Sequence, residues 1–186
     1  MTAAGIKLRK ASIRDIRPIL ALINSYAAEG LMLERTEFDL SENIRDFSVA
    51  VDNQTILGCG ALHFYTPTTA EIRSLAVAKD LSGAGIGRSI VEALEEEARE
   101  NGLEAIFAFT YVTGFFARLG FHEVERGELP LKVWKDCLRC PKFSACDEVA
   151  VLRLLRPDHW SESQPGQWAQ TASPDDRFIQ IPTPLR

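Results

Sequence analysis

The sequence predicts an α/β protein of the α+β kind, with a mixed, mostly antiparallel and twisted sheet flanked by helices. Two observations lead to this fold class. Alternating or continuous short apolar segments indicate strands within residues 47–65, 70–77 and 105–110. Between the last two, residues 86–100 repeat apolar side chains at the period of an amphipathic helix. At 186 residues the chain suits one domain with a sizeable core.

The N-terminal part predicts one strand and two helical segments. Residues 6–9 form a short strand pattern, and Asp15 is placed to cap the helix that follows. Pro18 then falls in the first turn, where its missing N–H costs little. Gly30 ends this helix, and residues 31–46 are expected to form a loop and a second helical segment. The apolar face of the first helix consists of Ile16, Ile19, Leu20 and Ile23.

Two turns organise the middle of the chain into antiparallel strands. Alternating residues 47–51 run through Asp52-Asn53 into the apolar segment 56–65, which is the pattern of a hairpin. The turn at residues 66–69 then leads into the strand 70–77.

The next segments predict a helix, a buried strand, a short helix and a closing pair of strands. The helix that starts at residue 86 stops at Asn101-Gly102. After the strand 105–110 come a helix at residues 115–119 and two antiparallel strands at 121–125 and 148–155. The buried face of the long helix is expected to be Ile86, Ile90, Val91, Leu94 and Ala98, with Glu95, Glu96, Glu97 and Arg99 mostly towards solvent.

A glycine-rich turn joins the strand 70–77 to the long helix. Gly83, Gly85 and Gly87 permit positive φ and close approach of a ligand to the backbone. Amide groups that converge at a helix N-terminus form a cradle for a phosphate or pyrophosphate. The turn is not a P-loop, because Arg88-Ser89 stands where a P-loop has Lys followed by Ser or Thr, and its glycine spacing differs from the dinucleotide fingerprint.

This turn resembles the pyrophosphate-binding motif of the GNAT (Gcn5-related) N-acetyltransferases, Arg/Gln-x-x-Gly-x-Gly/Ala. The motif falls on residues 82–87, with Ser82 in place of the leading Arg or Gln, and a second family hallmark falls on residues 115–121, Phe-Phe-Ala-Arg-Leu-Gly-Phe. The resemblance covers residues 6–155 and implies a GNAT fold, with strand and helix order βααβββαβαββ, and acetyl-CoA as the co-substrate. The cofactor contacts that it implies are Leu75, Ala76, Val77, Ser82, Gly83, Ala84, Gly85, Ile86, Gly87, Arg88 and Phe116.

Three further segments resemble the short bacterial N-acetylglutamate synthases within this family. They are Cys59-Gly-Ala-Leu together with residues 71–77, then Phe109-Thr-Tyr, and the long segment 129–143. The resemblance implies transfer of an acetyl group to the α-amino group of glutamate, or of the similar glutamine, as the first step of arginine biosynthesis.

The reaction needs a base, an oxyanion donor and a proton for the leaving thiolate. By resemblance Glu71 is the base, although an exposed strand carboxylate is the alternative, and a backbone N–H near Leu75 is the donor. Phe116 stands where many family members have a proton-donating Tyr, so Thr110, as first choice, or Ser74 would supply a hydroxyl, unless solvent serves.

A dicarboxylate substrate also needs fixed cations. Arg73 lies two residues from Glu71 and therefore on the same face of the strand, where it could bind substrate or form a plain ion pair. Further substrate-binding candidates in the segment 129–143 are Lys132, Arg139 and Lys142.

The cysteines allow two interpretations. The spacing Cys137-x2-Cys140-x5-Cys146, with Cys59 or His122 as a fourth ligand, could hold a structural zinc, but only one clear pair is present, so free thiols are favoured and no metal is predicted. The remaining histidines, His63 and His159, have no evident partners in the sequence.

Composition limits the partners. With 21 basic and 26 acidic residues the net charge is -5, which argues against nucleic acid. No apolar run has the length of a membrane span and no signal-peptide pattern precedes the domain, so we expect a cytoplasmic protein.

We expect residues 1–155 to be the acetyltransferase domain. Residues 156–186 then form a C-terminal tail, packed on the domain or on a partner subunit through Trp160, Trp168, Phe178 and Ile181, and this favours a homodimer. Two other functions stay open: a GNAT enzyme that acetylates a protein or polyamine amine, and a non-catalytic acetyl-CoA-binding regulatory module.

Overall fold

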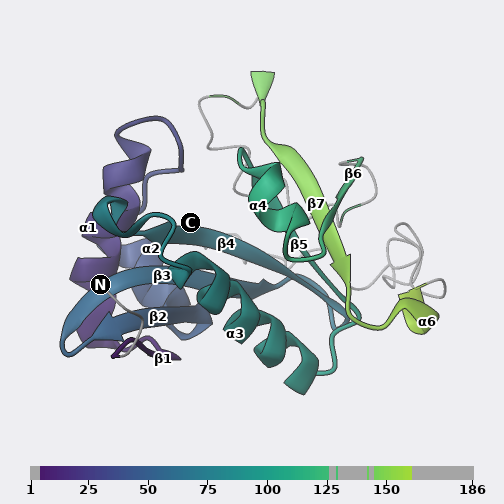
Figure 1. Ribbon diagram of the computed structural model, residues 1–186, viewed down its shortest axis with the longest axis horizontal. Coiled ribbons are helices and arrows are strands. Elements are labelled where there is room, and N and C mark those ends of the chain that lie inside the picture. The colour runs from purple at the N-terminus through teal and green to yellow at the C-terminus, as the bar shows by residue number, and fades with distance from the viewer. Residues whose placement is uncertain (1–4, 126–128, 130–141, 143–144, 161–186) are drawn as a thin grey trace, which may run out of the picture.

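The computed structural model describes residues 5–125, 129, 142 and 145–160. Seven strands form one sheet in the order β1-β2-β3-β4-β5-β7-β6 (Figure 1). The strands are β1 (Lys7–Lys10), β2 (Phe47–Asp52), β3 (Thr55–Phe64), β4 (Thr69–Val77), β5 (Ala105–Thr110), β6 (His122–Val124) and β7 (Val149–Leu154). Neighbouring strands are antiparallel except β4 and β5, which are parallel. The predicted mixed, mostly antiparallel sheet is therefore confirmed.

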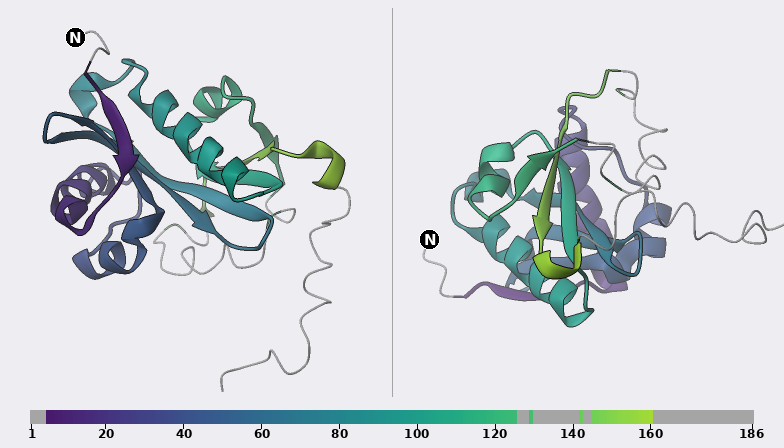
Figure 2. Two further views of the ribbon diagram at one scale, coloured as in Figure 1. Left: turned by 90° about the horizontal axis from the view of Figure 1, so that it is seen from below. Right: turned by 90° about the vertical axis from the view of Figure 1, so that its right-hand side faces the viewer.

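Helices lie on both faces of this sheet. They are α1 (Ile16–Ala27), α2 (Glu37–Asn43), α3 (Ile86–Glu100), α4 (Thr113–Ala117) and α6 (Pro157–Trp160), with short 3-10 turns η1 (Ile13–Asp15), η2 (Ile44–Asp46) and η3 (Lys79–Leu81). Figure 2 shows α3 on one face and α1 with α2 on the opposite face. The predicted tail belongs to the described part of the chain only as far as α6, so most of its expected aromatic anchors lie outside the described residues.

Two glycines bring α3 directly against the sheet. A Cβ added to Gly58 would lie 2.9 Å from Ile90 Cδ1, and one added to Gly60 would lie 2.9 Å from Ile90 Cγ2. Both distances are shorter than side chains tolerate, so β3 needs glycine here. Ile90, which is fully buried, therefore packs on the backbone of β3 and fixes the position of α3.

A cluster of apolar side chains fills the space between the sheet and α1. Ile19 and Ile23 from α1 and Leu40 from α2 are buried against Val49 and Ala61 of the sheet. The helix period predicted from the sequence thus presents the expected face to the core. Among the described helices, none combines the length and the apolar character that crossing a membrane requires.

Asp15 precedes α1 as predicted, but its carboxylate does not cap that helix. It accepts hydrogen bonds from the backbone N and the Oγ of Ser12, and it pairs with the guanidinium of Arg9 at 2.7 and 2.9 Å. Asp15 is thus the N-cap residue of α1, as predicted, but its side chain closes the turn η1, of which it is the last residue, instead of bonding to the helix. The hydrogen bonds from Arg9 hold the pKa of Asp15 well below its usual range.

We expect Asp15→Asn to lower the free energy of unfolding at pH 7 by about 1–2 kcal/mol, because hydrogen bonds to a charged group are lost while Arg9 is partly screened by solvent. A pKa that is depressed on folding gives stability above the unfolded-state pKa of about 4 and loses it as the pH falls below that value. Urea unfolding at pH 7 and pH 3 measures the difference, which should shrink at the lower pH.

The matched control is Arg17→Gln, which breaks the exposed pair between Arg17 and Glu37. Exposed pairs contribute little, so this variant should stay within about 0.5 kcal/mol of the parent at both pH values. An Asp15→Asn protein with the parent's stability at pH 7 would show that the Arg9 pair contributes nothing.

Glu95 was expected to face solvent, and this prediction was wrong. It is 9% exposed, and its Oε1 forms ion pairs with Arg99 at 2.8 Å and with Arg153 at 2.9 Å. Arg153 comes from β7, so the strand that closes the sheet covers a side of α3 that looks polar in the sequence. A charge on that side is satisfied by a partner from a distant segment rather than by water.

Candidate active site

The sheet opens between its two parallel strands. β4 pairs with β5 only over Thr69–Glu71 and Ala105–Phe107, within the described residues. Beyond Glu71, β4 continues against β3, while β5 continues against β7. Figure 1 shows β4 and β5 diverging after the short region in which they pair. Crevices at the carboxyl ends of parallel strands are common ligand sites, and Glu71 stands on the rung where the separation begins.

A bulge interrupts β4 just beyond this rung. Cys59 pairs with Ala76 and Ala61 pairs with Arg73, so β4 carries one residue more than β3 between these rungs. Ser74 has a φ of 53°, a left-handed conformation that non-glycine residues rarely adopt. Strain of this kind gathers at functional sites, and a bulge re-aims the groups that follow it.

The fully buried Cys59 supports the bulge from β3. Its Sγ lies 3.6 Å from the Ser74 carbonyl oxygen, and burial raises the pKa of the thiol to about 12. The thiol therefore keeps its proton and can donate it to that carbonyl.

The predicted glycine cradle lies at the start of α3. Gly83 and Gly85 have φ values of 83° and 84°, and Gly85 is the N-cap of the helix. Among the described residues other than the chain neighbours, no atom lies within 4 Å of a Cβ added to either glycine. The helix begins with unsatisfied backbone N–H groups, which attract anions. The turn, the helix start and the exposed Ser82 thus lie together at the start of α3.

Gly87 differs from the other two glycines. It is the second residue of α3 and does not have a positive φ, so the positive φ expected there is found only at Gly83 and Gly85. A Cβ at Gly87 would meet Phe115 at 3.6 Å, which places the Phe115 ring beside the first turn of α3. Phe116, the aromatic residue predicted to contact the cofactor, is 3% exposed and packs edge-on against Phe115 and Phe121 in the core.

Glu71 belongs to a half-buried polar cluster on the sheet. It is 9% exposed, and its Oε2 accepts a hydrogen bond from Tyr65 Oη at 3.0 Å. His63 is the cross-strand partner of Glu71, and its Nδ1 lies 2.6 Å from Asp46 Oδ2. His63 was expected to have no evident partner, and this expectation was wrong because η2 brings Asp46 to it across the sheet.

Arg73 joins the same cluster. Its Nη2 donates to Asn43 Oδ1 at 3.2 Å and lies 3.9 Å from Asp46 Oδ2. The side chain is 12% exposed. Of the two interpretations drawn from the sequence, ion pair and substrate clamp, these contacts favour the ion pair, with Asp46 rather than Glu71 as the carboxylate.

Sequence reasoning missed Asn43, Asp46 and Tyr65. Each looks unremarkable in its own segment, and no local spacing relates them to Glu71. They join the cluster through the contacts Asn43–Arg73, Asp46–His63 and Tyr65–Glu71, which depend on how β2, β3 and β4 pair.

The two predicted hydroxyls lie on either side of the opening. Ser74 is in the bulge of β4, and Thr110 is the last residue of β5, 6% exposed. Thr110 Oγ1 accepts a hydrogen bond from Val112 N at 3.0 Å, which leaves the hydroxyl proton able to be donated.

Lys142 lies near the end of β5 as well. Its Nζ donates to Tyr111 Oη at 3.1 Å and lies 3.3 Å from Asp147, and these contacts raise the pKa of Lys142. Burial raises the pKa of Tyr111, whose hydroxyl donates to Asp147 and lowers the pKa of that carboxylate. The other predicted substrate-binding residues, Lys132 and Arg139, lie outside the described residues.

Two of the four cysteines, Cys59 and Cys146, are among the described residues. Cys137 and Cys140 lie outside the described residues, whereas Cys59 is fully buried and Cys146 Sγ lies 4.0 Å from Glu148 Oε2. Within the part of the chain that the structure describes, no three His, Cys, Asp or Glu side chains are grouped to bind a metal ion.

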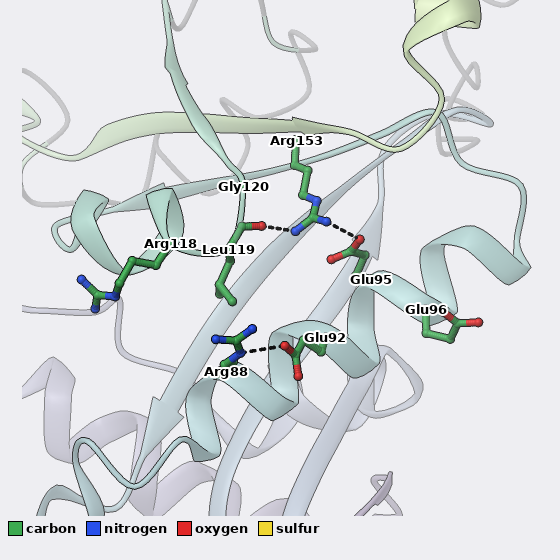
Figure 3. A pocket seen from close by; sticks show the side chains of 8 residues that line it. All are labelled: Arg88, Glu92, Glu95, Glu96, Arg118, Leu119, Gly120 and Arg153. Carbon is green, nitrogen blue, oxygen red and sulfur yellow. Dashed lines mark hydrogen bonds and ion pairs between the residues drawn. The ribbon is translucent and has the colours of Figure 1, made fainter.

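A cavity of about 500 Å³ lies between α3 and β7 (Figure 3). Arg153 crosses it from β7, donating to the Leu119 carbonyl and pairing with Glu95, while Arg88 pairs with Glu92 along the helix. Arg88 connects the cavity with the cradle, but Glu71, Ser74 and Thr110 are not among its lining residues. The predicted catalytic residues therefore lie outside this cavity. The lining residues are Arg88, Glu92, Glu95, Glu96, Arg118, Leu119, Gly120 and Arg153.

Known proteins are similar to this chain in sequence. The model of the acetyltransferase (GNAT) family matches residues 14–121. An uncharacterized N-acetyltransferase of Chlorobaculum tepidum is 43% identical over 155 residues, which cover 83% of this chain and all of the relative. The amino-acid acetyltransferase of Mycobacterium tuberculosis is 36% identical over 154 residues, 81% of this chain and 87% of the relative.

A crystal structure provides a further match. N-acetylglutamate synthase from Neisseria gonorrhoeae, complexed with coenzyme A and N-acetyl-glutamate, is 27% identical with a TM-score of 0.74. The match covers 81% of this chain and 35% of that chain, so this chain corresponds to about a third of the synthase.

A sheet that opens between two parallel strands, beside a glycine-rich helix start, is an arrangement that suits an anionic ligand. The chain belongs to the acetyltransferase (GNAT) family, as the sequence motifs predicted. It is an acetyl-CoA-dependent N-acetyltransferase by this membership.

Proposed function

We propose that this enzyme transfers the acetyl group of acetyl-CoA to the α-amino group of glutamate, or of glutamine, as the first step of arginine biosynthesis. One observation carries the choice of acceptor. The amino-acid acetyltransferase of Mycobacterium tuberculosis matches this chain over most of the length of both proteins. The N-acetylglutamate synthase of Neisseria gonorrhoeae, with its bound product and coenzyme A, supports the same class of acceptor.

The cradle would hold the pyrophosphate of acetyl-CoA. The backbone N–H groups of Gly83, Gly85, Ile86 and Gly87 supply the donors, since that of Ala84 is bonded to the Leu81 carbonyl, and Arg88 adds a cation at the first turn of α3. The acyl arm would then follow Leu75, Ala76 and Val77 into the opening between β4 and β5. This route brings the thioester to the bulge at Ser74.

Glu71 is proposed as the general base. The ammonium N–H bond breaks, its proton passes to a Glu71 oxygen directly or through water, and the electron pair stays on nitrogen. The amine then attacks the thioester carbonyl carbon, and a backbone N–H near Leu75 stabilises the negative oxygen. When the carbon–sulfur bond breaks, the nitrogen releases its second proton to solvent. The thiolate takes a proton from solvent, directly or relayed by the hydroxyl of Thr110 or Ser74, which regains its own proton from solvent.

The substrate carboxylates would pair with cations beside the opening. Arg73 and Lys142 already have acidic partners, so a substrate carboxylate would have to share them. Glutamine has one carboxylate fewer than glutamate and would need one cation fewer. Relative turnover of the two amino acids therefore reports on how many cations the site supplies.

Thiol release from acetyl-CoA tests the acceptor. The panel consists of glutamate, glutamine, other amino acids, spermidine and a short peptide, with N-acetylglutamate as a control that lacks a free α-amine. We expect kcat/KM for glutamate or glutamine to exceed that for the other acceptors by about tenfold or more. Preferred turnover of the peptide or of spermidine would replace the proposal by the alternative acceptor, and binding of acetyl-CoA without any turnover would favour a regulatory module.

A further inference from the structure

A phenol contacts the carboxylate that stands where the sheet opens. Tyr65 Oη donates to Glu71 Oε2 at 3.0 Å, and the Glu71 side chain is almost buried. Burial penalises the charged form of a carboxylate, whereas a hydrogen bond donated to it favours that form. A general base must be ionised before it can accept a proton, so this donor acts on the property that the reaction needs.

The Tyr65 ring is held from two sides. The His63 ring meets it edge-on at a centroid distance of 5.1 Å, and the fully buried Phe107 lies 5.7 Å away on β5. His63 is in turn fixed by the 2.6 Å contact between its Nδ1 and Asp46. A phenol locked by packing keeps its hydroxyl at one place and so orients the group that it binds.

We propose that Tyr65 is a positioning residue for the acetyl transfer, which holds the Glu71 carboxylate ionised and in one orientation. The proposal rests on the proposed role of Glu71 as the base. Tyr65 keeps its own proton throughout: an N–H bond of the ammonium breaks and an O–H bond forms on Glu71. The acid–base groups of the described residues that belong to this cluster are Asp46 from η2, His63 and Tyr65 from β3 and its end, and Glu71 and Arg73 from β4.

Tyr65→Phe removes the hydroxyl and keeps the ring. We expect kcat to fall about 10- to 100-fold, the range that corresponds to losing one hydrogen bond to a charged group. The KM for acetyl-CoA should stay unchanged. Since the ionised carboxylate loses a donor, the acidic limb of the kcat profile should move to higher pH. A tyrosine fluorinated on the ring, a more acidic donor, should move the limb to lower pH.

The experiment is a double-mutant cycle with Glu71→Gln, measured with acetyl-CoA and glutamate or glutamine. If Tyr65 acts through Glu71, Tyr65→Phe has no further effect on kcat in the Glu71→Gln enzyme. Loss of kcat that is equally large in both backgrounds overturns the proposal, because Tyr65 would then act independently. If Tyr65→Phe keeps the wild-type kcat and pH profile while Glu71→Gln is slow, the positioning role of Tyr65 is overturned and the role of Glu71 as the base stands.

A titration without turnover separates this proposal from the choice of substrate. The protein is labelled with ¹³C at the side-chain carboxyl groups of its glutamate residues, and NMR follows their titration without substrate. The Glu71 resonance is the one that Glu71→Gln removes, and its shift with pH gives the titration midpoint of Glu71. We expect the midpoint to rise in Tyr65→Phe. A midpoint that does not move overturns the proposal whatever the acceptor, and a wild-type kcat in Glu71→Gln overturns the base and the positioning role together.

Discussion

Glu71→Gln is expected to lower kcat by about 10²- to 10⁴-fold, the contribution that a general base typically makes. The amide keeps the shape and the hydrogen-bonding reach of the carboxylate, but it cannot accept a proton at neutral pH. Glu71 is well placed for this role, because it stands on the last rung that joins β4 to β5 and is nearly buried there. The loss should shrink as the pH rises, since more of the substrate amine is then already deprotonated.

Initial rates of CoA release across neutral and alkaline pH measure this effect. Binding of acetyl-CoA should stay near that of the wild type, because the cradle is built from a different part of the chain. Glu123→Gln on β6 is the matched control, since it makes the same substitution at an exposed strand carboxylate. A Glu71→Gln enzyme with wild-type kcat at every pH would show that water or another group takes the proton.

Gly85→Val is expected to weaken acetyl-CoA binding by about tenfold or more. The backbone at Gly85 has a φ of 84°, and a side chain in this left-handed region costs about 1–2 kcal/mol, with a β-branched residue least tolerated. In the part of the chain that the structure describes, no atom beyond the chain neighbours lies within 4 Å of the new Cβ. The loss of affinity therefore arises from a turn that no longer aims its N–H groups, and from a side chain in the space that the phosphates would occupy.

Calorimetric titration with acetyl-CoA tests this prediction on a folded variant. Gly102→Val provides the control, because Gly102 has a φ of 75° and lies just beyond the opposite end of α3. Both variants should lose stability through the same backbone strain, whereas only Gly85→Val should lose affinity. Equal affinities in the two variants would remove the glycine turn from the cofactor site.

The sequence by itself determined the order of the elements and the place of the cradle. The hairpin of β2 and β3, the α3 helix and the turn at Gly83 and Gly85 all follow from local signals, namely a period of 2 or 3.6 residues and glycine where φ must be positive. Such signals lie within a few residues of the feature that they specify. They can therefore be recognised in the sequence without knowing which strand pairs with which.

The tertiary structure alone decided how the polar residues of the site are partnered. Arg73 meets Asn43 across 30 positions of the chain, and His63 meets Asp46 across 17. These contacts depend on strand register, and no local pattern encodes it. The burial of Glu95 depends in the same way on Arg153, which the closing strand brings to it.

The bulge at Ser74 shows the same limit most clearly. Serine has no special tolerance for a positive φ, so nothing in its own segment predicts one. The conformation arises because β3 and β4 differ by one residue between two pairs in register. The sequence could thus place Ser74 on the strand, but only packing of that strand against its neighbours could turn the backbone there.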